Sequence, residues 1–278
     1  MTAAPSRLNG EAIDAANAEN FVDFFTLLGA VPGAEQKICD GFVRVSAPVP
    51  HPFYNFVYGF DALARGSDLD AAIGEALAPF RARNCPMMWI VFPAFASGSE
   101  RLIARLAAAG LTSFGEYRGM AVDLSAAVET SRPATDLVIE RVADAETMRQ
   151  WVEVQVACDS RTHERIKEVR VRQAAARGFD PADRQRTYLA RLAGAPVGGA
   201  ILHVAARAAG VYQVATLPEA RRRGVACAMT RQALFEGRAR GCRLGVLHAT
   251  PMAESLYRSI GFVDRSPVKV FIDLPSPP

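Results

Sequence analysis

The 278-residue sequence predicts a mixed α/β (α+β) fold in two halves, each a mixed central sheet flanked by helices. Short apolar stretches typical of strands alternate with stretches that place apolar residues at helical spacing. One stretch, 211–262, runs from strand through loop to helix and then again from strand to helix. The elements before residue 125 also repeat part of the order found after residue 136. With 50% hydrophobic residues, the chain is long enough for two domains with a core each.

The first half predicts a helix, a hairpin and then alternating strands and helices. Phe21, Phe24, Phe25 and Leu28 recur at helical spacing over 20–28, where Gly29 follows as a stop signal. Asp40-Gly41 separates two short apolar segments, a composition typical of a tight hairpin turn. The elements expected next are a strand over 53–60, a helix with Ser67 as candidate cap and Leu69, Ile73, Leu77 and Phe80 on one face, a strand over 87–92, a helix over 99–109 and a strand over 117–124.

The second half begins after segment 126–135, which contains Ser131-Arg132-Pro133 and little periodicity. We place the domain boundary there and expect domains over 1–127 and 128–278. The elements expected next are a strand over 137–142, a helix capped by Asp144 with Met148, Trp151, Val152 and Val156 on one face, a helix over 161–177, strands over 187–192 and 197–204 turning at Gly194, the central stretch, and a last strand with Val268, Val270 and Ile272 in alternation.

The central stretch predicts an anion-binding loop. A strand over 211–216 and a turn at Pro218 lead into the basic loop 221–226, and a helix then runs to about Gly237. This order points the free N–H groups and the positive dipole end of the helix at one spot, which suits a phosphate. Gly224 lets the backbone approach an anion closely, and Ala226 keeps side-chain bulk away.

The loop has the spacing Arg-x-x-Gly-x-Ala, which differs from the two common nucleotide-binding loops, G-x-x-x-x-G-K-[ST] and G-x-G-x-x-G. Further along, an apolar strand over 244–247 leads into Ala253-Glu254-Ser255-Leu256-Tyr257-Arg258-Ser259-Ile260-Gly261-Phe262. In this order and separation, the two motifs resemble the signatures of the GNAT superfamily of acyl-CoA-dependent N-acyltransferases. The second motif resembles the A-x-x-L-Y-x-x-x-G-F helix of that family. The resemblance covers 137–274 as one acyltransferase domain.

The resemblance implies acetyl-CoA as acyl donor and a site for it. The pantetheine arm would pair with the strand before the loop, and the pyrophosphate would lie on the N–H groups of the loop. Tyr257 is the implied acid that protonates the departing thiolate. Thr250 stands where the family frequently has Asn, and its hydroxyl can replace part of the hydrogen bonding of that amide. The expected cofactor-binding residues are Val214, Ala215, Thr216, Arg221, Arg222, Arg223, Gly224, Val225, Ala226 and Thr250.

The first half resembles an acyltransferase domain that has lost its cofactor site. When the halves are aligned on Cys85 and Cys242, Gly224 falls opposite Ser67 and Arg221 opposite Ala64. Counting back from the glycines before the last strands places Leu106 opposite Tyr257. The loop residues and the tyrosine are therefore absent from the first copy, which predicts a tandem protein with a degenerate N-terminal domain.

The general base stays open at this point. In the family it is often a carboxylate or histidine on a central strand, but this strand offers Tyr212 and Gln213, neither of which is suited to act as a base. Asp159, His163 and His203 remain as alternatives. His248 lies in a strand pattern, where a lone histidine is more often structural. Each motif also has a structural explanation that involves no cofactor. A buried Tyr257 is compatible with packing alone, and the basic loop is compatible with a solvated turn.

Two functions follow. The first is an N-acetyltransferase that moves an acetyl group from acetyl-CoA to a primary amine of a small molecule or peptide by direct attack. The alternative is a non-catalytic acyl-CoA-binding or regulatory protein, prompted by the missing base and the degraded first half. The sequence leaves open the acceptor amine and whether the donor carries an acetyl or a longer acyl group.

The amino-acid composition limits the kinds of binding partner and the cellular compartment that we expect. A net charge of +3 does not predict nucleic-acid binding, and no basic block with interleaved aromatic residues occurs. Five scattered cysteines without a C-x-x-C pair indicate buried thiols in a reducing compartment. No metal-ligand spacing and no long apolar run occur, so we expect neither a metal nor a membrane span. The expectation is a cytoplasmic monomer or homodimer.

Overall fold

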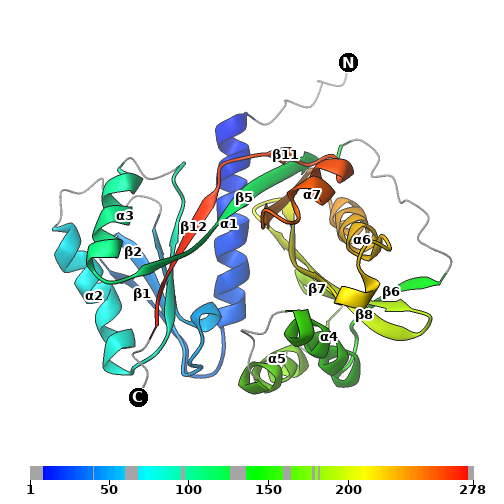
Figure 1. The fold of residues 1–278 in the computed structure, drawn as a ribbon, viewed down its shortest axis with the longest axis horizontal. Helices are drawn as coiled ribbons and strands as arrows, with labels where there is room; N and C mark the ends of the chain where they lie inside the picture. The colour runs from blue at the N-terminus through cyan, green and yellow to red at the C-terminus, as the bar shows by residue number, and fades with distance from the viewer. Residues whose placement is uncertain are drawn as a thin grey trace.

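A computed structural model describes residues 9–39, 41–59, 68–94, 98–125, 136–158, 164–176, 179–180 and 182–274. Two sheet-and-helix halves lie on either side of the long helix α1 (Gly10–Gly29), and strands cross from each half to the other (Figure 1). The predicted boundary segment 126–135, Ser67 and the base candidates Asp159 and His163 lie outside the described residues. Among the described residues, no helix has the length and apolar character needed to span a membrane.

The first half has the predicted order of elements. After α1 come β1 (Glu35–Cys39), β2 (Phe42–Ser46), the 3-10 turn η1 (Pro52–Tyr54), β3 (Phe56–Gly59), α2 (Leu69–Ala82), β4 (Met87–Val91), α3 (Ser99–Ala108) and β5 (Thr112–Asp123). The expected hairpin is confirmed, since Cys39 pairs with Phe42 across the turn. The predicted apolar face of α2 is also confirmed, because Leu69, Ile73, Leu77 and Phe80 are all buried.

Three local predictions in this half need correction. Helix α1 begins ten residues earlier than expected, because the side chain of Asn9 accepts a hydrogen bond from the Ala12 N–H at 2.7 Å and caps it. Strand β3 is shorter than expected, because Pro52 starts a 3-10 turn and the Asn55 amide donates to the Val49 carbonyl at 2.6 Å. Helix α2 is capped by Asp68 and not by Ser67.

The second half also follows the predicted order. Its elements are β6 (Leu137–Arg141), α4 (Ala145–Cys158), α5 (Glu164–Ala176), β7 (Gln185–Leu192), β8 (Ala195–Ala205), β9 (Ala208–Thr216), the 3-10 turn η2 (Pro218–Ala220), α6 (Val225–Ala239), β10 (Leu244–Ala249), α7 (Glu254–Ile260), β11 (Val263–Asp264) and β12 (Val268–Asp273). The predicted cap of α4 is present, since Asp144 accepts from the Thr147 N–H at 2.8 Å.

The two halves exchange their last long strands. The strand order is β1-β2-β3-β4-β12-β5-β10-β9-β8-β7-β6, with β11 paired to β5. The second half's β12 lies between β4 and the start of β5, while the end of β5 pairs with β10 of the second half. In Figure 1 these two strands run across the middle of the molecule. The sheet of each half is therefore completed by a strand from the other.

Both halves have the same pattern of strand pairing. In the first, two antiparallel pairs lead to β3, which is parallel to β4. In the second, after a further antiparallel pair of β6 with β7, two antiparallel pairs lead to β9, which is parallel to β10. The strand received from the other half is antiparallel in each case. The matching order that the sequence shows thus extends to the direction of the strands.

The largest core cluster is shared by the two halves. It contains Phe24 of α1 and Tyr58 of β3 together with Trp151 of α4 and Tyr212 of β9, all of them buried. The ring of Phe24 stacks on Tyr212 with centroids 4.1 Å apart. Burial of such aromatic side chains contributes about 2–3 kcal/mol each, so the junction is a packed interior and not a linker between separate domains.

Candidate functional site

The site predicted from sequence lies where β9 and β10 separate. These parallel strands are paired from Leu244↔Ala208 to Val246↔Gly210 only, although β9 continues to Thr216 and β10 to Ala249. Their far ends remain paired to their outer neighbours, β8 and β5. An opening between two strands of the sheet is the result, and its edges carry the backbone groups of Val214 and Ala215.

A bulge in β9 produces this separation. Gly199 pairs with Ala215 but Ile201 pairs with Tyr212, so β9 carries one residue more than β8 over this span. Gln213 lies in the bulge with φ of +51°, a left-handed conformation that is uncommon for residues other than glycine. The bulge therefore turns the strand away from β10 at the level of the expected thioester.

Two helices hold the bulge in place. The Gln155 amide on α4 donates to the Gln213 backbone carbonyl at 2.9 Å, and the Arg170 guanidinium on α5 donates to the Gln213 side chain at 2.6 Å. Arg170 is itself buried and lies 5.5 Å from the centre of the Trp151 ring. Sequence reasoning missed Gln155 and Arg170, because neither falls in a motif and their partner is known only from the fold.

The basic loop leads from β9 into α6 as predicted. Arg221, Arg222, Arg223 and Gly224 are all exposed, and Arg222 and Gly224 have positive φ of +64° and +79°. Gly224 precedes the first residue of α6, and no side chain caps this helix end. The first N–H groups of α6 and its positive dipole end therefore follow directly on three exposed arginines, an arrangement that suits a pyrophosphate.

A further polar group beside the loop lacks a partner. The hydroxyl of Thr216, at the end of β9, is buried and makes no hydrogen bond within the described part of the chain. Its backbone carbonyl accepts from the Arg221 side chain at 3.3 Å. A buried hydroxyl without a partner is uncommon in folded proteins, and here it lies on the strand expected to pair with the pantetheine arm.

Tyr257 lies in an apolar environment on α7. Its side chain is 7% exposed and packs edge-on against Phe262 with ring centroids 5.8 Å apart. Burial raises the pKa of its hydroxyl well above the usual range, so the phenol keeps its proton at neutral pH. Thr250 is exposed between β10 and α7, where its carbonyl accepts from the Ala253 N–H at 2.9 Å.

The base candidates on the central strands are engaged elsewhere. His203 is completely buried, and its Nε2 lies 2.7 Å from Oδ2 of Asp23 on α1. Tyr212 donates from its hydroxyl to the Asn20 side chain at 2.7 Å, and burial raises its pKa. Both contacts join the first half to the second. In the described ranges, no three His, Cys, Asp or Glu side chains gather in a way that would hold a metal ion.

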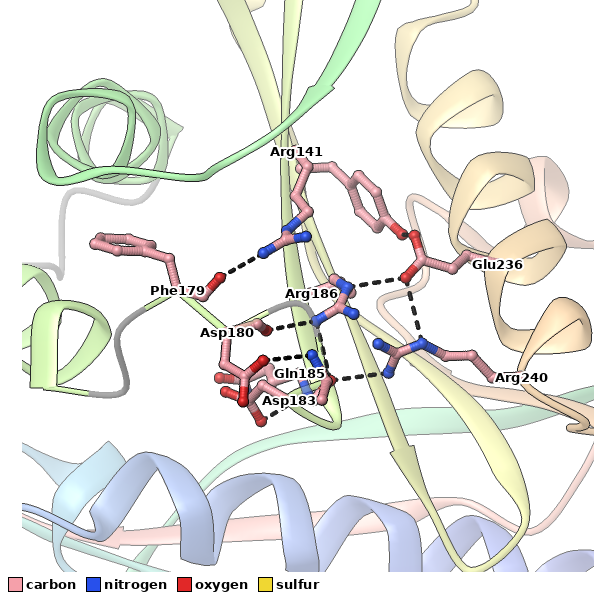
Figure 2. A network of polar contacts seen from close by, with 10 residues as sticks. Arg141, Phe179, Asp180, Asp183, Gln185, Arg186, Glu236 and Arg240 are labelled. Atoms are coloured by element: carbon pink, nitrogen blue, oxygen red, sulfur yellow. Dashed lines mark hydrogen bonds and ion pairs between the residues drawn. The ribbon is translucent and has the colours of Figure 1, made fainter.

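A separate polar network joins β7 to α6 (Figure 2). Arg186, which is almost fully buried, pairs with Glu236 at 2.9 Å and donates to the backbone carbonyls of Asp180 and Asp183 at 2.9 and 3.0 Å. Tyr188 donates to the other oxygen of Glu236 at 2.5 Å. These groups bind one another, so the network fixes α6 against the sheet.

Comparison with known proteins identifies the fold. A family model described as acetyltransferase (GNAT) domain matches residues 183–264, which include β9, the basic loop, α6, β10 and α7. A search of curated protein sequences finds no match.

Solved structures match nearly the whole chain. A GCN5-related N-acetyltransferase from Kribbella flavida is 20% identical, with 92% of this chain and 95% of that chain covered and a TM-score of 0.66. One from Sphaerobacter thermophilus is 16% identical, with 98% and 95% covered and a TM-score of 0.64. A tandem GNAT protein from the clavulanic acid biosynthesis pathway is 13% identical, with 96% and 97% covered and a TM-score of 0.58.

The fold of the protein follows from these matches. Residues 183–264 are similar to acetyltransferase (GNAT) domains, and across its length the chain shares the fold of solved GCN5-related N-acetyltransferases. The predicted fold class is thereby confirmed.

Proposed function

We propose that the protein transfers an acetyl group from acetyl-CoA to a primary amine of a small molecule or peptide. The observation that carries this proposal is the opening between β9 and β10, which leads directly to the uncapped end of α6. A backbone edge beside an anion-binding helix end has the two features that a pantetheine arm and its pyrophosphate require.

The donor-binding roles follow from position. Val214, Ala215 and Thr216 would offer their backbone groups, and the unpartnered Thr216 hydroxyl, to the pantetheine arm. The N–H groups from Arg222 to Ala226 would bind the pyrophosphate, with the guanidinium groups around it. Thr250, exposed beyond the end of β10, would offer its hydroxyl to the arm from the other side of the opening.

The chemistry is direct attack. The amine nitrogen forms a bond to the thioester carbonyl carbon, the carbon–sulfur bond breaks, and the nitrogen releases one proton to solvent, from which Tyr257 later regains the proton that it donates. Tyr257 would donate a proton to the departing thiolate, a role that its retained phenol proton supports. Gln155 and Arg170 would contribute indirectly, through their hydrogen bonds to Gln213. These bonds hold the bulge of β9 at the level where the thioester carbonyl would lie.

Release of free thiol tests this function. Purified protein is mixed with acetyl-CoA and with 2-phenylethylamine, spermidine or a lysine-containing peptide, and coenzyme A is measured by its thiol. We expect release that depends on both the amine and the protein. Coenzyme A binding by calorimetry is measured in parallel, and absence of binding would contradict the proposal regardless of the amine chosen.

Binding without turnover is the second candidate. The observation that favours it is that His203 and Tyr212 are buried and already bonded, so neither is free to act as base. The same experiment separates the two functions, because a regulatory protein would bind coenzyme A and release no thiol with any amine.

The chain would consist of two domains, over 1–127 and 128–278. The first of them would be a degenerate copy without a cofactor site. The pairing of β3 supports this proposal, because every residue from Phe56 to Gly59 is paired with β4 and the two strands do not separate within these described residues. We also propose a cytoplasmic location and a monomer or homodimer. The location is supported by the thiols of Cys85, Cys227 and Cys242, which form no disulfide within the part of the chain that the structure describes.

A further inference from the structure

A small cavity lies where the first half meets β10. It measures about 10 Å³, room for one water-sized group, and Asn17 of α1 and His248 of β10 are among the residues that line it. Phe92, just after β4, and Ser266, just before β12, also line it, so both halves contribute.

The polar groups in this cavity lack partners. Asn17 is 3% exposed, yet neither its amide oxygen nor its amide nitrogen makes a hydrogen bond within the described residues. The Nδ1 atom of His248 is also buried and unbonded there. Leaving such groups unpaired costs free energy, so an Asn retained in this position points to a polar group that binds there.

Gly119 allows other segments to approach His248 closely. It pairs directly with His248 across β5 and β10, so a side chain on it would stand next to the imidazole. A Cβ there would lie 2.1 Å from the Ser266 carbonyl oxygen and 3.2 Å from the Asn17 amide nitrogen. The absence of that side chain allows α1 and the segment before β12 to approach the sheet.

The cavity reaches the part of β10 that is no longer paired with β9, which is one edge of the proposed donor site. His248 comes two residues after Val246, the last residue of β10 that is paired with β9. Its neighbour Leu247 packs in the cluster under α6 and α7, so His248 faces the opposite side, where it contacts Phe21 of α1 at 4.5 Å between rings. An amine approaching the opening from the α1 side would meet this cavity first.

The charges around the cavity are matched. Asp14, which also lines it, accepts from the Arg265 guanidinium at 2.9 and 3.0 Å and from the Ser266 hydroxyl at 3.1 Å. Burial lowers the pKa of His248 to about 3, so the imidazole is neutral at pH 7. A neutral group therefore fits the cavity better than an ion.

We propose that this cavity receives the acceptor's amino group in its neutral form, with its two N–H bonds donated to Asn17 Oδ1 and His248 Nδ1. The proposal rests on the acetyltransferase function proposed above and names the acceptor subsite. With both protons bound in this way and the imidazole proton on Nε2, the nitrogen keeps its lone pair for the thioester carbonyl. Desolvation favours this uncharged, nucleophilic form, which supplies what a strong general base would otherwise provide.

Kinetics of an isosteric variant give the first test. Asn17→Leu should raise the KM for the amine at least tenfold and leave the KM for acetyl-CoA within twofold, because only the acceptor loses a partner. Its melting temperature should equal or exceed that of the wild type, since a buried unpaired amide is removed. Glu19→Leu places the same side chain on the exposed face of α1 and should change neither KM.

Nitrogen NMR gives a second test that does not need turnover. In ¹⁵N-histidine-labelled protein, with the His248 signal assigned from His248→Phe, methylamine should shift the Nδ1 resonance in the wild type but not in Asn17→Leu. Trimethylamine, which has no N–H in its neutral form, should not shift it. If methylamine leaves the resonance unchanged, the subsite proposal is wrong.

The two proposals fail in distinguishable ways. If the wild type acetylates an amine but Asn17→Leu retains the amine KM, or loses acetyl-CoA affinity by the same factor, only the subsite proposal is overturned. If no amine is acetylated yet methylamine shifts His248, the acetyltransferase function fails and the cavity remains an amine-binding site.

Discussion

The left-handed backbone at Gly224 is the residue-scale feature on which donor binding depends. Gly224→Val should weaken coenzyme A binding at least about tenfold, because a β-branched residue at φ of +79° strains the turn that presents the α6 N–H groups. Gly194→Val is the matched control, since Gly194 has φ of +84° and equally open surroundings at the β7–β8 turn. Calorimetry that finds equal affinity in both variants would remove the loop from the site.

Tyr257 makes a second residue-scale prediction. Tyr257→Phe should lower turnover by about 10²–10⁴-fold and leave coenzyme A affinity unchanged, because only the proton donor is lost. Tyr188→Phe is a useful contrast, since it removes the 2.5 Å bond to Glu236 and should lower the melting temperature without lowering turnover. Wild-type turnover in Tyr257→Phe would mean that the tyrosine serves packing alone.

Motif residues were visible in the sequence and partner residues were not. Gly224 and Tyr257 stand at fixed positions in two spaced motifs, so the sequence alone marked them as site candidates. Asn17 and Gln155 carry no such signal, because an amide in a helix acquires a role only from what the fold places against it. The sequence around His248 showed only the alternation that is typical of a strand. Its surroundings depend on Gly119, which lies in the first half of the chain and pairs with His248 only in the fold.

At the scale of elements, α1 is joined to the second half through Asn20. Its buried amide donates to the carbonyls of Ala205 and Ala208 at 2.9 and 3.1 Å and accepts from the Tyr212 hydroxyl. Asn20→Ala should therefore reduce the free energy of unfolding by about 2–4 kcal/mol, because these groups stay buried without partners. Urea unfolding measures this, with Glu19→Ala on the exposed face as control. An Asn20→Ala variant as stable as Glu19→Ala would contradict the role assigned to α1.

The contact between Asp23 of α1 and His203 of β8 should make stability depend on pH. The hydrogen bond from His203, with the charge of Arg184 nearby, lowers the pKa of Asp23 below its usual value of 3.8. A lowered pKa in the folded state means that the carboxylate stabilises the protein above about pH 4 and loses this effect as pH falls further. Asp23→Asn should be less stable than wild type at pH 7, and the difference should shrink below pH 4. A difference that persists unchanged at pH 3 would contradict the assignment.

The local sequence was enough to predict whether a segment forms a helix or a strand. It did not predict which other helices and strands that segment contacts. The apolar spacing of α2 and the alternation in β12 depend on neighbours in the chain, so both were predictable. The first turns of α1 lack an apolar stripe, and its start at Gly10 was set by a single cap. Which strand lies beside β4 depends on the whole fold, and β12 looks the same in sequence whichever sheet it joins.

At the scale of the molecule, the strand exchange predicts how fragments behave. A fragment over 134–278 lacks β5, so β10 keeps an unpaired edge and β12 has neither of its neighbours. We expect this fragment to aggregate. A fragment over 111–278 retains β5 for both strands and should be more soluble and bind coenzyme A, which size-exclusion chromatography and calorimetry will show. Equal solubility and full activity in the shorter fragment would mean that the exchange is dispensable.

The position of β12 also constrains how the protein is made. The sheet of the first half contains β12, which ends at Asp273, five residues before the end of the chain. On a ribosome that adds about 5–20 residues per second, β4 would wait roughly ten to forty seconds with an open edge before its neighbour emerges. The first half therefore cannot complete its sheet until β12 has been synthesised, although it is translated first. A premature stop just before β12 would leave an N-terminal half that is intact in sequence and unable to close its sheet.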